Sequence, residues 1–219
     1  MSTVRNLVII GTGGLAKELA QLARQIDPRR LRWDEITYCA DGAEKKLTEL
    51  PYGKVGLTDK ELVALDEKTD VAIGVGYPWV REKISTELQK NGNLEFPNMI
   101  HPSVMLDPDM VTLGVGNVIT VGCVFTCNIV IGDFNLFNWN STVGHDVEMG
   151  SCNVVNPASS ISGHVKIGNS CLIGTGARLL EKIQVTDGVI IGAGAVVVRS
   201  IQIPGVYVGI PAKFKKARR

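Results

Sequence analysis

The fold is decided by residues 143–173, which read VGHDVEMGSCNVVNPASSISGHVKIGNSCLI. A bulky apolar residue stands at every sixth position of this segment, beginning with Val143 and Met149. The same spacing extends in both directions to give sixteen consecutive positions: Leu113, Ile119, Phe125, Ile131, Phe137, Val143, Met149, Val155, Ile161, Ile167, Ile173, Leu179, Val185, Ile191, Val197 and Ile203. A six-residue apolar period predicts a parallel β-helix, in which one residue in six points inward at the same place on each flat face.

The same repeat predicts the size of the β-helix and its boundary. Three hexapeptides make one prism-shaped coil, so the repeat predicts about five coils in a column roughly 25 Å tall. Such coils pair through backbone hydrogen bonds and need few charged side chains. Charged residues number 29 among the first 100 but only 11 among residues 101–212. Because breaks at Pro97 and Pro102 coincide with this change, we expect two domains, residues 1–97 and 98–219, the second with a C-terminal cap.

The first domain shows strands alternating with helices. Apolar runs at 7–10, 36–39 and 71–75 predict buried strands, and helical patterns follow the first and the last of them, which together predict a parallel α/β sheet. The turn Gly11-Thr12-Gly13-Gly14 stands where a helix N-terminus can approach a phosphate, and with Ala16 it satisfies G-x-G-x-x-A. Asp41 follows the next strand. A tight turn without a ligand explains the glycines too, and about 95 residues suit a nucleotide-bearing substrate better than a dinucleotide cofactor.

The composition argues against several classes of protein. A net charge of +1 argues against a protein that grips nucleic acid or an anionic membrane. The longest apolar runs are too short or too rich in glycine to span a bilayer, and no signal-peptide pattern opens the chain. CxxC spacing is missing, so we expect the five cysteines to be core thiols of a cytoplasmic protein: Cys39, Cys123, Cys127, Cys152 and Cys171.

Several motifs along the chain form one pattern: Gly11-Thr12-Gly13-Gly14, Ala72-Ile73-Gly74-Val75-Gly76 with Arg81, Gly144-His145-Asp146, Asn156-Pro157, Ile191-Gly192-Ala193-Gly194-Ala195 and Gly209-Ile210-Pro211-Ala212-Lys213. In this order they resemble the NeuD/PglD-type family of bacterial sugar acyltransferases, over essentially the whole chain. The resemblance implies an α/β Rossmann-like domain followed by a left-handed parallel β-helix. It also implies a homotrimer with active sites between neighbouring β-helices and with acetyl-CoA as the acyl donor.

The resemblance assigns the chemistry to one of the three histidines. It implies that His145 is the general base and that Asp146 orients its ring and raises its basicity. From the residues alone, a surface turn histidine is the simpler interpretation. The resemblance also places Asn138 near the substrate, and an asparagine ladder at a coil corner explains that residue equally well.

Two binding regions follow from the resemblance. The first domain is expected to hold a nucleotide-sugar substrate through Gly11, Thr12, Gly13, Gly14, Asp41 and Arg81. The acetyl-CoA arm is expected to lie along small residues of the coils, with one backbone N–H on the thioester oxygen and the basic tail on the CoA phosphates. These cofactor-binding residues are Gly163, Gly174, Thr175, Ala193 and Lys213. For the tail beyond Lys216, which includes Arg218 and Arg219, a solvated terminus is an equal alternative.

The other two histidines raise the question of a metal. Some left-handed β-helices are zinc carbonic anhydrases that use three histidines. Here the histidines are 44 and 19 residues apart and His101 precedes the repeat, so we expect no metal site. We expect His164 to be a surface turn residue or part of the lip of the CoA groove.

Three positions depart from the family pattern. Leu15 and Val154 stand where many relatives have a histidine, and Ala40 stands where one of two acidic residues is usual. These departures leave the expected chemistry of His145 intact but affect which sugar and nucleotide the first domain reads.

Together these features predict an acetyl-CoA-dependent N-acetyltransferase that acts on a nucleotide-linked amino sugar in surface glycan biosynthesis. O-acetylation of a sialic-acid-like sugar is the nearest alternative. A non-catalytic nucleotide-sensing trimer and an NAD-dependent oxidoreductase that uses the glycine turn are alternatives of other classes.

Overall fold

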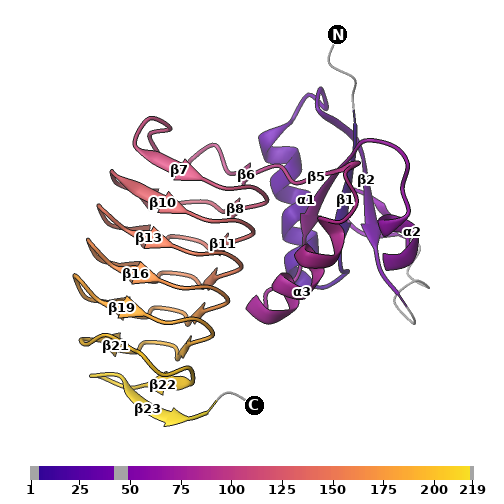
Figure 1. Ribbon diagram of the computed structural model, residues 1–219. Helices are drawn as coiled ribbons and strands as arrows, with labels where there is room; N and C mark the ends of the chain where they lie inside the picture. The colour runs from indigo at the N-terminus through magenta and orange to yellow at the C-terminus, as the bar shows by residue number, and fades with distance from the viewer. Residues whose placement is uncertain (1–4, 42–48, 218–219) are drawn as a thin grey trace.

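The computed structural model describes residues 5–41 and 49–217, which form an α/β domain beside a triangular β-helix (Figure 1). The α/β domain holds one parallel sheet in the order β3-β2-β1-β4-β5. Its strands are β1 (Arg5–Ile10), β2 (Trp33–Cys39), β3 (Lys54–Leu57), β4 (Thr69–Ile73) and β5 (Leu94–Glu95). Its helices are α1 (Gly14–Ile26), α2 (Asp59–Val63) and α3 (Pro78–Leu88). The predicted parallel α/β sheet is confirmed.

Helix α1 packs closely because small residues meet at its start. Its buried face consists of Ala16, Leu19, Ala20, Leu22 and Ala23. Gly74, just after β4, lies against this face: a Cβ there would stand 2.7 Å from the Cβ of Ala16 and 2.6 Å from the carbonyl oxygen of Ile10. Since such contacts are too short for any side chain, this position requires glycine.

The β-helix has three flat faces of parallel strands, and its coils are left-handed. The first face holds β7 (Val111–Leu113), β10 (Ile129–Ile131), β13 (Glu148–Met149), β16 (Lys166–Ile167) and β19 (Gln184–Val185). The second holds β6 (Met99–Ile100), β8 (Val118–Ile119), β11 (Leu136–Phe137), β14 (Val154–Val155), β17 (Leu172–Ile173), β20 (Ile190–Ile191), β22 (Val206–Val208) and β23 (Lys213–Lys216). The third holds β9 (Val124–Phe125), β12 (Thr142–Val143), β15 (Ser160–Ile161), β18 (Arg178–Leu179) and β21 (Val196–Val197).

Residues eighteen apart are partners in neighbouring coils. Val143 pairs with Ile161, and Ile161 pairs with Leu179, which places the predicted six-residue series inside the column. The corners between faces contain residues in the left-handed backbone region, with φ of 54° at Asn128 and 57° at both Asp146 and His164. The first and third faces carry five strands each, and the second carries eight. The predicted β-helix is thus confirmed.

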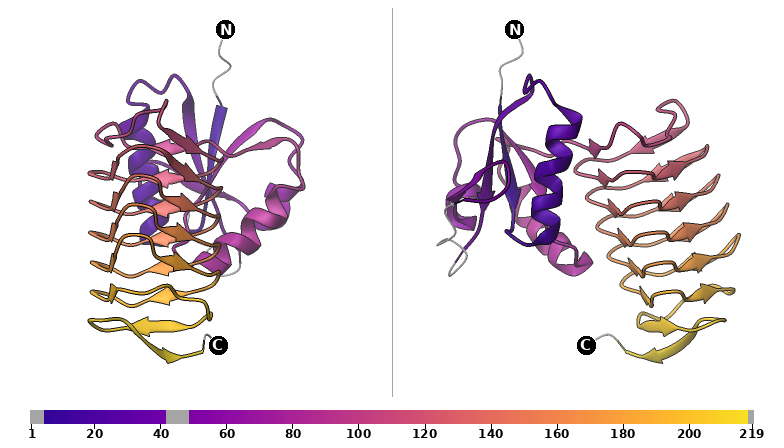
Figure 2. Two further views of the ribbon diagram at one scale, coloured as in Figure 1. Left: turned by 60° about the vertical axis from the view of Figure 1, so that its left-hand side comes forward. Right: turned by 180° about the vertical axis from the view of Figure 1, so that it is seen from behind.

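The two domains share a buried interface. Helix α1 faces the second face of the β-helix (Figure 2), and Met99, Val118, Leu136 and Val154 join the apolar cluster beneath it. Helix α3 lies along the corner between the first and second faces, where Glu82 accepts a hydrogen bond from Ser170 at 2.6 Å. The expected domain boundary after residue 97 lies between Glu95, the last residue of the α/β sheet, and Met99 in β6.

The C-terminal end of the column turns back on itself. Strand β23 pairs antiparallel with β22, so the parallel series of the second face ends in a hairpin. Across the described ranges, no helix combines the length and the apolar character that a membrane crossing needs.

Candidate active site

His145 stands on the corner between the third and first faces, just after β12. Its Nδ1 lies 2.7 Å from Oδ2 of Asp146, and its side chain is half exposed. The left-handed backbone of Asp146 turns this carboxylate onto the ring of the preceding residue, while its N–H donates to the carbonyl of Cys127 in the coil before. A carboxylate on Nδ1 favours the tautomer with the proton on that nitrogen, which leaves Nε2 as the basic atom.

Both carboxylate oxygens of Asp146 lie near polar side chains of the neighbouring coils. Nδ2 of Asn128 donates to Oδ1 at 3.3 Å, and Nε2 of His164 lies 3.7 Å from Oδ2. The hydrogen bond from His145 is the main cause that lowers the pKa of Asp146 below its ordinary value, helped by Asn128 and by the charge of His164. The carboxylate is therefore ionised wherever His145 can act as a base.

His164 lies in the site rather than at a distance from it. Its ring meets that of His145 edge to face, with centroids 5.0 Å apart and planes at 88°. Sequence reasoning placed His164 on the surface or at the lip of the donor groove and missed this contact. The signal was present in the numbering, since His164 is eighteen residues after Asp146 and so stands one coil along at the same corner.

Gly163 makes room for the ring of His145. A Cβ at this position would lie 2.5 Å from Cε1 and 2.6 Å from Nε2 of His145, so the ring lies directly over the glycine. Within the described ranges, no group accepts a hydrogen bond from the N–H of Gly163. That N–H is thus available beside the ring of His145.

The remaining residues expected along the coils lie at another corner. Asn138, Gly174, Thr175 and Ala193 follow β11, β17 and β20, at the corner between the second and third faces. Within one chain the third face separates them from His145. Asn138 also donates to Oδ1 of Asn156 at 3.3 Å, which is the ladder contact considered as its alternative.

The glycine turn lies at the carboxyl end of β1, as expected for an anion site. Gly11 has φ of 93°, Thr12 is buried, and α1 begins at Gly14 with Gly13 before it. Asp41 stands near the same edge after β2, and its Oδ1 accepts the N–H of Asp59 at 3.3 Å. A side chain at Gly13 or Gly14 would meet nothing within 4 Å, so the backbone there is open to a ligand.

Arg81 has a structural position that its motif did not predict. The side chain is fully buried in α3, and it donates to the carbonyls of Ile73 and Val75 in its own domain and of Phe134 in the β-helix, at 2.9 to 3.0 Å. Burial lowers its pKa to about 10, which still leaves it protonated at neutral pH. We therefore correct the expected substrate contact to a link between the domains.

The basic tail is only partly described. Lys213 opens β23 and is exposed at the end of the column, whereas Arg218 and Arg219 lie outside the described residues. The structure brings Lys213 into no contact with the His145 corner.

One cluster offers donor atoms of the kinds that hold a metal ion. Single atoms of His145, Asp146 and His164 lie within 4.8 Å of one another. His101 is not a member, and its Nδ1 instead contacts the hydroxyl of Ser103 at 2.8 Å. Nδ1 of His145 and Oδ2 of Asp146 are 2.7 Å apart, which is hydrogen-bond distance, whereas two ligands of one tetrahedral zinc ion stand roughly 3.3 Å apart. The geometry is that of a hydrogen-bonded acid–base pair.

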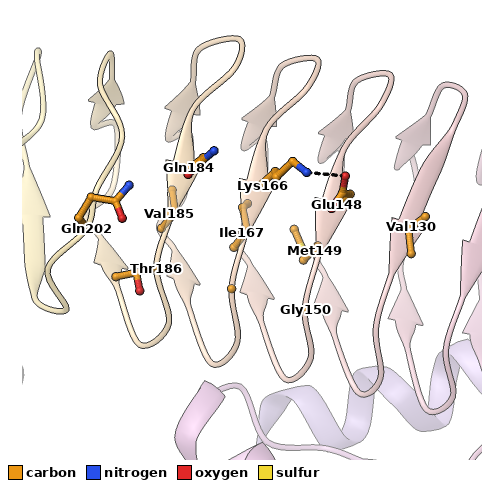
Figure 3. A pocket seen from close by; sticks show the side chains of 11 residues that line it. Val130, Glu148, Met149, Gly150, Lys166, Ile167, Gln184, Val185, Thr186 and Gln202 are labelled. Atoms are coloured by element: carbon orange, nitrogen blue, oxygen red, sulfur yellow. Dashed lines mark hydrogen bonds and ion pairs between the residues drawn. The ribbon is translucent and has the colours of Figure 1, made fainter.

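A shallow groove of about 580 Å³ runs across the first face and contains none of the expected site residues. Figure 3 shows the side chains that line this groove. Lys166 reaches Glu148 of the neighbouring coil, and Gln184 and Gln202 lie farther along the column. The contact between Nζ of Lys166 and the Glu148 carboxylate is 2.8 Å long and exposed. The groove is thus a coil surface beside the His145 corner rather than a second reactive centre.

Comparison with known proteins matches both halves of the chain. Residues 6–88 match the PglD N-terminal domain family, and residues 164–199 match the bacterial transferase hexapeptide family. No curated protein sequence matches the chain.

Several solved structures share the whole architecture. The acetyltransferase domain of PglB from Neisseria gonorrhoeae FA1090, in complex with acetyl coenzyme A, is 29% identical with a TM-score of 0.89, over 97% of this chain and 100% of that one. PerB from Caulobacter crescentus, in complex with CoA and GDP-perosamine, is 29% identical with a TM-score of 0.84, over 98% and 99%. WeeI from Acinetobacter baumannii AYE is 28% identical with a TM-score of 0.84, over 97% and 100%.

These similarities extend over both domains, in the same order and at nearly full length. The chain is therefore an acyltransferase that joins a PglD N-terminal domain to bacterial transferase hexapeptide repeats.

Proposed function

We propose that the protein transfers an acetyl group from acetyl-CoA to the amino group of a nucleotide-linked sugar, in the biosynthesis of a surface glycan. The observation that carries this proposal is the contact of 2.7 Å between Nδ1 of His145 and Asp146, which leaves Nε2 of the ring as a base on an accessible corner. The similarity to PerB, solved with CoA and GDP-perosamine, and to the PglB domain, solved with acetyl coenzyme A, supports the two substrates.

In the reaction, the nitrogen of the acceptor amine attacks the thioester carbonyl while Nε2 of His145 takes a proton from that amine. The C–N bond forms and the C–S bond breaks, and the proton passes from His145 to the departing CoA thiolate. Asp146 stabilises the imidazolium that forms in between, because its carboxylate stays ionised. The free N–H of Gly163 supplies a donor for the developing oxyanion beside the base.

The donor site is completed by a second copy of the chain. Gly174, Thr175 and Ala193 lie on a different corner from His145 and Gly163, with the third face between them. When β-helices pack side by side in a homotrimer, the two kinds of corner from neighbouring chains can face each other. This arrangement supports active sites between subunits, with the pantetheine arm along the small residues and Lys213 toward the CoA phosphates.

The first domain delivers the acceptor. The open backbone of Gly13 and Gly14 at the start of α1 suits a diphosphate, and Asp41 at the same sheet edge suits a nucleobase N–H. Binding both reactants in one cleft supplies much of the rate enhancement through proximity. Because acetyl-CoA and nucleotide sugars are substrates of the cytoplasm, we place the reaction there.

The test is release of free thiol from acetyl-CoA in the presence of UDP-, dTDP- and GDP-linked 4-amino sugars. We expect release with one amino sugar, and a loss of kcat of about 100-fold or more in His145→Ala. Unchanged turnover in this variant would overturn the base assignment. Release with hydroxyl sugars alone would overturn the N-acetyltransferase assignment.

A further inference from the structure

We propose that His164 is a positioning residue for acyl transfer, which holds Asp146 and the ring of His145 so that Nε2 of His145 remains the basic atom. The inference rests on the proposed function and adds to it a residue outside the expected site. The evidence is the edge-to-face contact of the two rings, with centroids 5.0 Å apart, and the distance of 3.7 Å from Nε2 of His164 to Oδ2 of Asp146.

The coil repeat gives His164 this position. The N–H of His164 donates to the carbonyl of His145 at 2.9 Å, so the two backbones are tied across neighbouring coils. At the same corner, Asn128 precedes Asp146 by one coil and Lys182 follows His164 by one coil. Asp146 is therefore flanked on both sides along the column: the amide of Asn128 donates to Oδ1, and Nε2 of His164 stands 3.7 Å from Oδ2, where an ion pair forms when His164 is protonated.

This support matters because the base is exposed. His145 and His164 are 50% and 46% exposed, so the protein interior does not hold either ring. An exposed histidine samples several rotamers and both neutral tautomers, and only one combination directs a basic Nε2 at an acceptor. An aromatic edge-to-face contact restricts the rotamer of His145, and a fixed Asp146 restricts its tautomer.

The lysines near this corner are paired with other carboxylates, so the contact with Asp146 falls to His164. Lys182 is paired with the carboxylate of its neighbour Glu181 at 3.4 Å, and Lys166, two residues after His164, is paired with Glu148 at 2.8 Å. Asn128 is neutral. Among the described residues, the two histidines are thus the only side chains that contact Asp146 and can carry a positive charge.

The experiment compares His164→Ala, which loses ring and nitrogen, with His164→Phe, which keeps an aromatic edge but has no nitrogen. We expect His164→Ala to lower kcat by about 10-fold while KM for both substrates stays within twofold, and His164→Phe to recover part of the loss. A raised KM for acetyl-CoA with unchanged kcat would assign His164 to donor binding and overturn the proposal.

A second readout does not depend on turnover. Ring nitrogen chemical shifts of the full-length protein labelled with ¹⁵N-histidine report the tautomer of His145. We expect the tautomer protonated at Nδ1 in the wild type and a mixture in His164→Ala. An unchanged tautomer together with unchanged kcat would refute the positioning role. If instead no amino sugar is acetylated, the proposed function fails while the shifts still decide whether His164 positions His145.

Discussion

Gly163 gives the sharpest test of the site, because one methyl group there acts directly on the ring of His145, the proposed base. In Gly163→Ala the new Cβ would lie 2.5 Å from Cε1 and 2.6 Å from Nε2 of His145, and the three nearest atoms all belong to that ring. Ordinary contact begins at 3.4 Å, so the ring must move by about 1 Å. Since a misplacement of this size costs about 100-fold in rate, we expect kcat to fall by about that factor.

The fold should tolerate the same change. Gly163 has no left-handed φ, and the atoms in its way belong to an exposed side chain that can rotate, so alanine fits the backbone. The assay is thiol release from acetyl-CoA, with the melting temperature measured on the same sample. Gly92→Ala is the matched control, because a Cβ at Gly92 meets nothing within 4 Å and lies in the other domain. A Gly163→Ala enzyme with kcat within twofold of the wild type would refute the position of the base.

Three further outcomes follow from the structure. Asp146→Asn should lower kcat by about 100-fold without raising KM for acetyl-CoA, because it removes the ionised partner of His145; equal kcat values at pH 7 would contradict the pairing. Arg81→Met should lower the free energy of unfolding by roughly 3 kcal/mol in urea titrations, because two buried carbonyls and one partly buried carbonyl lose this donor; an unchanged midpoint would exclude the structural role. Iodoacetamide at pH 8 should modify the half-buried Cys127 before Cys39, whose thiol pKa is raised by burial; peptide mass spectrometry that finds Cys39 modified first would contradict this.

The β-helix could be predicted because its six-residue period is visible directly in the sequence. A side chain that points inward once in six positions must be apolar, and each such position, from Phe125 to Val197, falls on a buried strand residue. The parallel sheet of the first domain was equally readable from short apolar runs between helical patterns. In both cases each buried position must be apolar whatever its neighbours are. The order of apolar residues along the chain is therefore enough to predict these elements.

The site was harder to predict, because it depends on which residues meet across coils. Asp146 was found as the chain neighbour of His145, but the contact of His164 with both requires the register of eighteen residues. Arg81 shows the opposite error. Its motif gives a position near the ligand, whereas only the packing of α3 against Phe134 shows that the guanidinium points into the domain interface.

A β-helix corner suits a general base because neighbouring coils repeat the backbone but not the side chains. At one corner, the coil of His145 supplies the proposed base and its carboxylate, while the next coil supplies a gap at Gly163 and a second ring at His164. The backbone hydrogen bond from His164 to His145 fixes the spacing of these coils whatever the side chains are. The side chains at the corner can therefore change by single substitutions without loss of the fold, so a substitution of His164 can alter the surroundings of the His145 ring while the column stays intact.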